Sequence, residues 1–219
     1  MAFTKNGVWR IAKPIPGLPS GTAGLSACSR DGTCTGVTAD QAGVIFTVTE
    51  KNGHWDTTPH DIPGTGARGT FLHALSCPSA GNCSADGTNI DNVPFVTTEH
   101  NGTWTKIQNI PGLGLLNHGK GFKATITGLS CGPPGYCAAT GVADVYVTAT
   151  KVRSEAFVAS EIGGRWHFAQ IIPGVVKLDK QGDSAGNAVA CWSANHCAAG
   201  GFFAVGHSTS PFPFVDLEH

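Results

Sequence analysis

The sequence predicts an all-β protein, a four-bladed β-propeller in which four antiparallel sheets of four strands surround a channel. Two observations predict this fold. A pair of cysteines with five residues between its members occurs four times along the chain, and a similar sequence follows each pair. A repeat of about 50 residues is typical of propeller blades or of linear arrays. The chain also carries 30 Gly and 13 Pro, which suits many short strands joined by turns.

The first half of each unit is predicted to be a hairpin closed by its cysteines. In the second unit, residues 72–77 form an apolar strand, residues 78–81 have the composition of a turn, and residues 83–87 begin the returning strand. Cysteines on both sides of a tight turn can bridge the two strands. The predicted disulfides are Cys28–Cys34, Cys77–Cys83, Cys131–Cys137 and Cys191–Cys197.

The second half of each unit is predicted to be another hairpin. Residues 93–98 are rich in β-branched and aromatic side chains, and Asn101-Gly102 favours a two-residue turn. Residues 104–110 then form the fourth strand, which Pro111-Gly112 ends. Each unit is therefore predicted to be a four-stranded antiparallel meander.

Two short patterns mark the fourth strand of every unit. The first pattern, Asn-Gly-x-Trp, ends at Trp9, Trp55 and Trp104, and a Gly-Gly variant ends at Trp166; the second, Ile-Pro-Gly, begins at Ile15, Ile62, Ile110 and Ile172. The tryptophans could be platforms on which a ligand stacks. Because they recur at one position of every unit, we favour packing between neighbouring sheets.

The two ends of the chain predict how the ring closes. Residues 6–17 carry the fourth-strand patterns without the three strands before them, and residues 212–215 resemble a third strand. We therefore expect the N-terminal strand to complete the last sheet. The predicted single domain, 1–216, has blades at 18–64, 65–112, 113–174 and 175–216 plus 1–17. Residues 217–219 resemble the start of a vector-encoded His tag and are excluded from the fold.

The cysteine count predicts an oxidising compartment. All eight cysteines fall into the four pairs, as in a disulfide framework of a secreted protein. Zinc ligation and free thiols are the alternatives. Zinc ligands usually stand two to four residues apart in groups of four, which this spacing does not provide. No apolar signal segment precedes the first repeat, so secretion implies that a signal peptide was removed or replaced by Met1.

Composition excludes several function classes. Charged residues make up 13% of the chain, the net charge is −1, and no basic stripe occurs, so we expect no nucleic-acid partner. No apolar run approaches the length of a membrane span, so we expect no membrane insertion. No phosphate-binding loop, dinucleotide fingerprint or zinc-protease motif occurs. We therefore expect no cofactor and no metal.

The repeat also resembles a known group of proteins. Cys-Pro-Ser-Ala-Gly-Asn-Cys at 77–83, followed by Asn-Gly-Thr-Trp at 101–104, is similar to the repeats of secreted β-propeller proteins, many of them actinobacterial. The resemblance covers nearly the whole chain, although the third and fourth copies diverge. It implies a fold and an extracellular location, and it implies no single activity.

Residues that differ between units are the better candidates for function, and the first group lies on the innermost strands. Four positions before the first cysteine stand His73, Thr127 and Asn187, which would form a polar ring at the channel. Asp86 is the ionisable residue at a second inward position. His73 and Asp86 could act as an acid–base couple. The alternative, which we favour, is a hydrogen-bonded channel filled with water.

The second group lies in the variable loops at one end of the sheets. Loops on a rigid scaffold are the usual place for binding residues. The candidate ligand-binding residues are His118, Lys120, Lys123, Tyr146, Arg153, Phe202 and His207. A basic and aromatic rim suits a small polar ligand such as a sugar, a uronate or another carboxylate. The alternative is that the charges only keep long loops soluble.

Three functions compete on this reading. The first is extracellular binding of a carbohydrate-like or anionic polar ligand at the loop-bearing face. The second is an enzyme, a lyase or hydrolase with His73, Asp86 or His207 as catalytic residues. The third is a protein-interaction scaffold that uses its outer rim. Because the candidate residues do not repeat in every unit, one central site is favoured over several equivalent ones.

Overall fold

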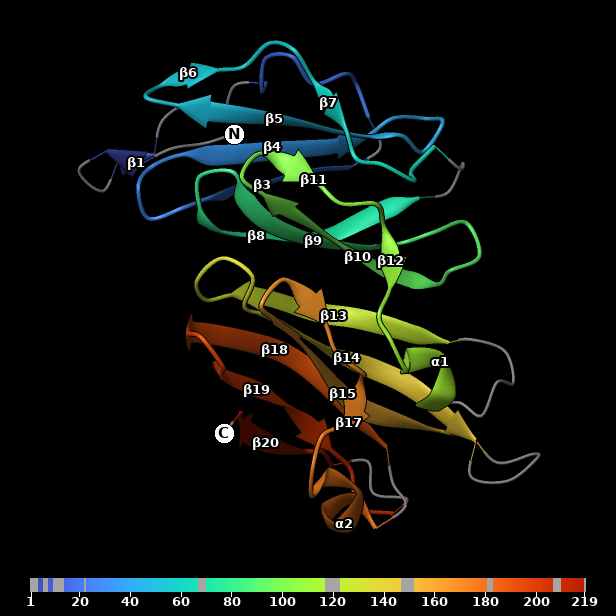
Figure 1. Ribbon diagram of the computed structural model, residues 1–219. Helices are drawn as coiled ribbons and strands as arrows, with labels where there is room; N and C mark the ends of the chain where they lie inside the picture. The colour runs from blue at the N-terminus through green and yellow to red at the C-terminus, as the bar shows by residue number, and fades with distance from the viewer. Residues whose placement is uncertain are drawn as a thin grey trace.

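The computed structural model contains four antiparallel sheets that follow one another along the chain (Figure 1). It describes residues 4–5, 8–9, 14–21, 23–66, 70–116, 123–146, 152–180, 183–206 and 210–218. Sheet 1 is formed by β3 (Ala23–Cys28), β4 (Cys34–Ala39), β5 (Ile45–Lys51), β6 (His54–Trp55) and β7 (His60–Asp61). Sheet 2 is formed by β8 (Phe71–Ser79), β9 (Asn82–Thr88), β10 (Pro94–His100), β11 (Thr103–Trp104) and β12 (Gln108–Asn109).

The other two sheets each follow a short helix. After α1 (Leu113–Leu116), sheet 3 is formed by β13 (Ala124–Cys131), β14 (Cys137–Tyr146), β15 (Val152–Ile162), β16 (Arg165–Trp166) and β17 (Gln170–Ile171). After α2 (Val175–Asp179), sheet 4 is formed by β18 (Ser184–Ser193), β19 (His196–Phe203) and β20 (Phe212–Leu217). The sequence patterns predicted no helix, because these helices span only four and five residues.

The meander predicted for each unit is confirmed in sheets 1 to 3, with one difference. The fourth strand is split into two short pieces, such as β11 and β12, and both pair with the third strand. The Asn-Gly turns hold the register: Glu50 pairs with Trp55 and Glu99 pairs with Trp104. Asn52 and Asn101 adopt positive φ, the conformation that this turn requires.

Each sheet contains one disulfide, as predicted. Cys28–Cys34, Cys77–Cys83, Cys131–Cys137 and Cys191–Cys197 all link the first strand of a sheet to the second. No cysteine is free. The zinc and free-thiol alternatives are therefore wrong, and four disulfides are typical of proteins from an oxidising environment.

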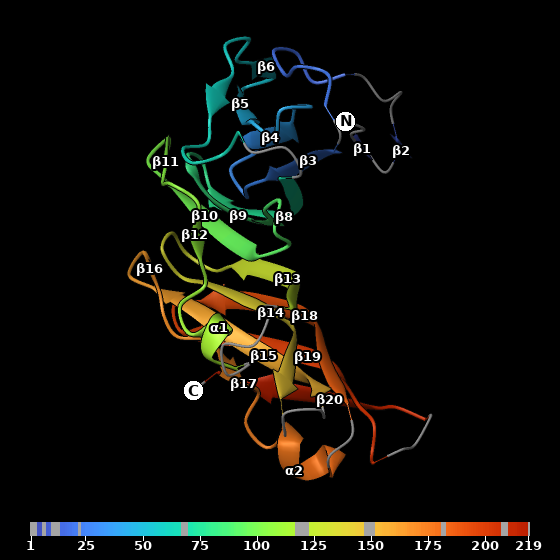
Figure 2. The same ribbon diagram turned by 90° about the vertical axis from the view of Figure 1, so that its right-hand side faces the viewer.

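The sheets stack face to face, and a hydrophobic core lies between each consecutive pair (Figures 1 and 2). The first strands β3, β8, β13 and β18 contact one another in that order. Trp104 of sheet 2 packs with Val37 and Ile62 of the first unit, and Trp166 of sheet 3 occupies the equivalent place in the next core. These two tryptophans are buried, which confirms their predicted packing role.

A polar contact accompanies this packing at the same repeat position. Glu161 pairs with Cys137, the second cysteine of its sheet, as Glu50 pairs with Cys34 in sheet 1. Glu99 has the same repeat position in sheet 2. The Glu161 carboxylate accepts hydrogen bonds from Thr98 (3.0 Å) and Ser84 (3.5 Å) of sheet 2. Burial raises the pKa of Glu161, and these hydrogen bonds oppose the rise. Neighbouring sheets are therefore joined by a buried carboxyl as well as by apolar side chains.

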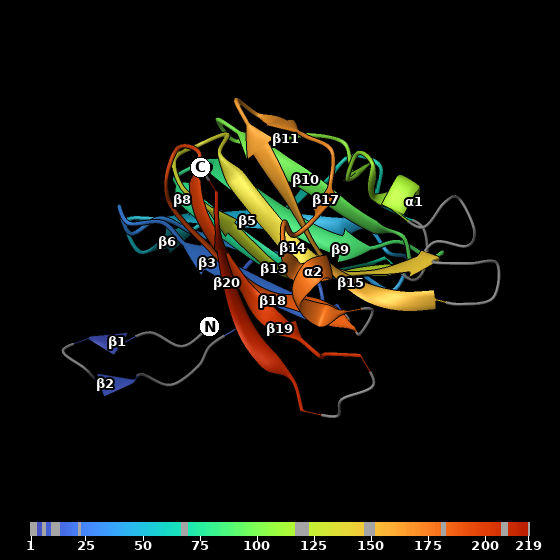
Figure 3. The same ribbon diagram turned by 90° about the horizontal axis from the view of Figure 1, so that it is seen from below.

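The predicted closure of the last sheet by the N-terminal strand is wrong for this structure. Among the described residues, β1 (Thr4–Lys5) and β2 (Val8–Trp9) pair only with each other, and β20 pairs only with β19. The small hairpin lies apart from the four sheets (Figure 3). Sheets 1 and 4 lie at opposite ends of the stack, so one short strand cannot join both. The repeat pattern specifies the contact between neighbouring sheets and leaves the closure of a ring undetermined.

The expected exclusion of residues 217–219 from the fold also needs correction. Leu217 is the last residue of β20, and the Glu218 amide donates a hydrogen bond to the Cys197 carbonyl (2.9 Å). Ser160 of sheet 3 donates to the Glu218 carboxylate (2.7 Å), as Thr98 of sheet 2 donates to Glu161. Glu218 therefore occupies the repeat position of Glu50, Glu99 and Glu161. His219 lies outside the described residues.

We expect removal of an inter-sheet tryptophan to destabilise the protein strongly. Truncating Trp104 or Trp166 to alanine leaves a large cavity between two sheets, at a cost of about 3–5 kcal/mol. The free energy of unfolding, measured by urea titration, checks this. Trp192→Ala is the matched control, because that side chain is 55% exposed and should change the value little. Equal losses at all three positions would contradict the packing role.

Candidate functional site

The loop-bearing end of sheets 2 and 3 contains a polar pocket of about 540 Å³. Its polar lining residues are His73, Thr88, Asn92, Lys123, Thr125 and Asp144. Two candidates from the sequence line this pocket: His73 of β8 in sheet 2, and Lys123, which directly precedes β13 of sheet 3. Its other lining residues are Ala124 and Val142. We call this cavity the polar pocket.

β-Bulges set the direction of the side chains that were predicted to form a ring. The ladder between the first and second strands shifts at His73 in sheet 2, at Thr127 in sheet 3 and at Asn187 in sheet 4. Bulges commonly redirect side chains beside functional sites. Sheet 1, which has Gly24 at this position, keeps a regular ladder.

The three bulge residues do not gather in one pocket. Thr127 donates a hydrogen bond from its hydroxyl to the Gly186 carbonyl of sheet 4, and Asn187 is exposed. Only His73 lines the polar pocket, where its Nε2 lies 3.4 Å from the Thr88 hydroxyl. The polar ring predicted at the channel is therefore replaced by one polar pocket between two sheets.

Asp86 lies directly behind His73 and is fully buried. Burial raises the pKa of Asp86 to about 7, and the nearby Ala74 amide opposes the rise. His73 Nδ1 is 3.8 Å from Asp86 Oδ2, which is too long for a hydrogen bond. Burial lowers the pKa of His73 below its ordinary value. Near neutral pH the pair thus combines a neutral imidazole with a carboxyl that is partly protonated.

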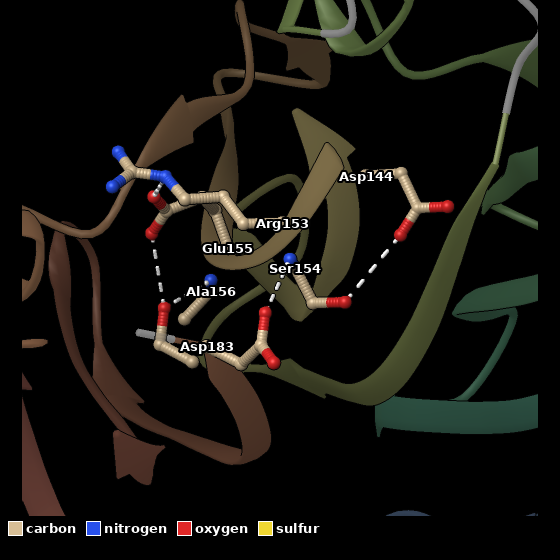
Figure 4. Close-up of polar contacts among 7 residues, drawn as sticks. Asp144, Arg153, Ser154, Glu155, Ala156 and Asp183 are labelled. Carbon is tan, nitrogen blue, oxygen red and sulfur yellow. Dashed lines mark hydrogen bonds and ion pairs between the residues drawn. The ribbon is translucent and has the colours of Figure 1, made fainter. Parts of the chain in front are cut away.

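A second polar cluster lies where β14 and β15 meet sheet 4 (Figure 4). Arg153 Nε lies 2.5 Å from the buried Glu155 carboxylate, which also accepts a hydrogen bond from Ser184 (3.1 Å). Burial raises the pKa of Glu155 to about 7, while Arg153 lowers it. Ser154 links Asp144 of the polar pocket to Asp183.

This cluster corrects the prediction for Arg153. The sequence suggested an Arg153 side chain free in a loop, but the residue belongs to β15 and its guanidinium is paired with Glu155. Strand β15 begins earlier than expected because Val152 and Arg153 extend the ladder with β14. Arg153 therefore holds the fold together beside the polar pocket, and it does not line that pocket.

The remaining candidates are divided between the structure and its undescribed parts. Phe202 lies in β19, is half-buried and does not line the polar pocket. Tyr146 ends β14, and its side chain is not described. His118, Lys120 and His207 lie outside the described residues.

Sequence reasoning missed four polar residues of the polar pocket and one other aromatic residue. The missed polar lining residues are Thr88, Asn92, Thr125 and Asp144. Thr88 and Asp144 lie near the end of the second strand of a unit and Asn92 follows that strand, which could have indicated these three. Trp192 belongs to no Asn-Gly-x-Trp element and lies on a second cavity of about 620 Å³. The hairpins of all four disulfides line this cavity, which we call the disulfide-end pocket.

No group of three or more His, Cys, Asp or Glu residues could hold a metal ion in the part of the chain that the structure describes. Within the same residues, no helix is both long enough and apolar enough to cross a membrane.

Comparison with known proteins adds little. No protein-family model matches the chain, and no curated protein matches its sequence. A fucose-specific lectin from Aleuria aurantia (Hg-derivative form) aligns with a TM-score of 0.42 and 14% identity. The alignment covers 84% of this chain, which spans about half the length (55%) of that lectin chain.

A second solved structure shows a lower similarity. The putative exo-β-1,3-galactanase from Bifidobacterium bifidum s17 aligns with a TM-score of 0.23 and 11% identity, over 84% of this chain and 83% of the other. TM-scores this low carry no argument about function. The structure itself defines the chain as an all-β protein of four antiparallel sheets, each with its own disulfide.

We expect the buried carboxyls to make the protein less stable as the pH rises. Burial raises the pKa of Asp86, Glu99 and Glu155 to about 7, so the folded chain binds these protons more tightly than the unfolded chain does. Their stabilising effect is complete below about pH 4 and is lost as the pH rises through about 7. Each group contributes up to about 1.4 kcal/mol per pH unit in that window.

Urea unfolding between pH 4.5 and pH 8 measures this effect. Asp86→Asn should reduce the decline, because it removes one of these titrations. Asp91→Asn, in the exposed turn after β9, is the control and should keep the full decline. Identical pH profiles for Asp86→Asn and the parent protein would show that Asp86 does not titrate in this window.

Proposed function

We propose that this chain is an extracellular protein of the β-propeller type, with its four sheets as blades, that binds a carbohydrate-like or anionic polar ligand in the polar pocket. The observation that carries the proposal is that His73 of sheet 2 and Lys123, at the start of sheet 3, line one polar pocket. Four disulfides support the extracellular location.

The chemistry of the pocket suits a ligand with many hydroxyl groups. Thr88, Thr125 and Asn92 can each donate and accept hydrogen bonds, and Asp144 can accept them. Lys123 supplies a positive charge for a carboxylate on the ligand. A purely hydrophobic ligand would leave these polar groups without hydrogen-bond partners.

An enzyme acting on the same class of ligand is the second candidate. The observation that favours it is the pair His73 and Asp86, in which a carboxyl with a pKa of about 7 lies behind an imidazole. Groups with shifted pKa values are often acids and bases in catalysis. Turnover of glycosides or uronates that Asp86→Asn abolishes would favour this candidate over simple binding.

We expect the protein to bind a glycan or uronate on an array, and calorimetry with the best ligand should locate the site. His73→Ala and Lys123→Ala should each weaken binding about tenfold or more, since each removes a polar partner from a small pocket. His54→Ala and Lys51→Ala, on the exposed β5–β6 turn, are the matched controls and should bind like the parent.

The same experiment tests the rival site. Trp192→Ala should leave the affinity unchanged, because Trp192 lines the disulfide-end pocket and not the polar pocket. Loss of binding in Trp192→Ala, together with normal binding by Lys123→Ala, would move the site to the opposite end of the sheets and contradict the proposal.

A further inference from the structure

A cavity of about 380 Å³ lies between sheets 3 and 4. The equivalent space between the other neighbouring sheets is filled by side chains. It is lined by Val158, Ser160, Pro173, Val189, Leu217 and Glu218, among others. We call it the tryptophan slot, because in the two preceding interfaces Trp104 and Trp166 occupy the equivalent place. Both of those tryptophans belong to the fourth strand of the later sheet. Sheet 4 has no strand beyond β20 among the described residues.

The repeat specifies what would fill the slot. In sheets 1 to 3 a tryptophan of the fourth strand pairs with a glutamate of the third strand. These pairs are Glu50–Trp55, Glu99–Trp104 and Glu161–Trp166. The residue after each tryptophan donates its amide to the residue before the glutamate, as in Asp56 to Thr49 (2.8 Å). Glu218 is already in the position of that glutamate. A strand of the Asn-Gly-x-Trp pattern would thus pair its tryptophan with Glu218 and its next amide with the Leu217 carbonyl.

The chain contains one such strand outside the four sheets, at its N-terminal segment. Residues 6–17 include Asn6-Gly7-Val8-Trp9 and Ile15-Pro16-Gly17, and the other copies of the pattern are used within sheets 1 to 3. β2 now pairs Trp9 with Thr4 of β1 in the register that the other sheets use for tryptophan and glutamate. A ladder of two residue pairs is weak. Glu218 could therefore replace Thr4 as the partner of Trp9.

Residues 14–17, the described part of this segment after β2, lie at the end of the stack opposite the slot of their own chain. Ile15 lies against Gly36 of sheet 1. Ile62, at the equivalent repeat position, packs in the core that contains Ala85 of sheet 2. Gly36 faces away from sheet 2, because the adjacent Val37 faces it. Six residues from Ile15 to Trp9 reach at most about 20 Å. Sheets stack about 10 Å apart, so the slot lies roughly 30 Å away.

Both outer faces of the stack resemble interfaces that lack their second half. Val215 on sheet 4 is 74% exposed, whereas its counterpart Val96 on sheet 2 is fully buried against sheet 3. At the other end, Trp55 is only half-buried, whereas Trp104 and Trp166 are buried by the sheet before them. The outer face of sheet 4 could therefore pack on the outer face of sheet 1 in the same way as neighbouring sheets pack within the chain.

We propose that the N-terminal strand of a second copy of this chain docks in the tryptophan slot, with Trp9 opposite Glu218, so that sheet 1 of one copy packs on sheet 4 of another. Such a contact is heterologous, because it joins two different surfaces. Each copy can therefore bind a further copy until the assembly closes into a ring. The fourth strand of sheet 4 is thus supplied in trans.

The mass of the protein in solution is the first test. Sedimentation across a range of micromolar concentrations should show assemblies of two or more copies. Trp9→Ala should weaken association about tenfold or more, as expected for a central aromatic anchor. Trp192→Ala is the control, and its association should equal that of the parent. A parent protein that is monomeric throughout, or equal association of Trp9→Ala and the parent, would overturn the proposal.

A crosslink decides whether the strand comes from the same chain. Arg10→Cys and Leu217→Cys place thiols at positions that should face each other across the new ladder. Mixing the two single variants under mild oxidation should give a crosslinked dimer. If only the double variant crosslinks, and does so as a monomer, the strand closes its own chain and the proposal is wrong. This test does not depend on a Trp9 variant that folds.

Discussion

The contact between neighbouring sheets is the constraint on which the rest of the structure depends. In each filled interface a tryptophan from the later sheet and an isoleucine from the earlier unit pack against small residues, as Trp104 and Ile62 pack near Ala85. A buried carboxyl such as Glu161 bonds across the same interface. Each sheet alone would leave one face open to water, so the sheets are stable only as a stack.

The polar pocket follows from this stacking. The sheet faces carry small and apolar side chains, while the ends of the strands are free to vary. The bulge at His73 and the loop residue Lys123 come together only because β8 and β13 lie side by side. Polar groups at this end also include the buried Asp86 and the pair Arg153–Glu155. Binding and assembly therefore use different parts of one repeat: strand ends for the ligand, sheet faces for the neighbour.

The two proposals are physically independent. A second copy that completes sheet 4 would contact Val215, Leu217 and Glu218, none of which lines the polar pocket. Ligand binding should thus survive in a variant that cannot assemble. Burial of Val215 in the assembly would also remove exposed apolar surface that an isolated stack presents to water.

The sequence by itself determined the strands, the turns and the four disulfides, because these depend on contacts between residues close in the chain. Cys77 and Cys83 flank one turn, and Asn101-Gly102 sets the register of Trp104. Only the tertiary structure decided which variable residues meet, since the position of Lys123 beside His73, and the pairing of Arg153 with Glu155, depend on sheet stacking and on strand ends. It also decided that β1 and β2, the described strands of the N-terminal segment, pair with each other and not with sheet 4. A repeat fixes the interface between two neighbours, whereas ring closure depends on the accumulated angle of the whole stack.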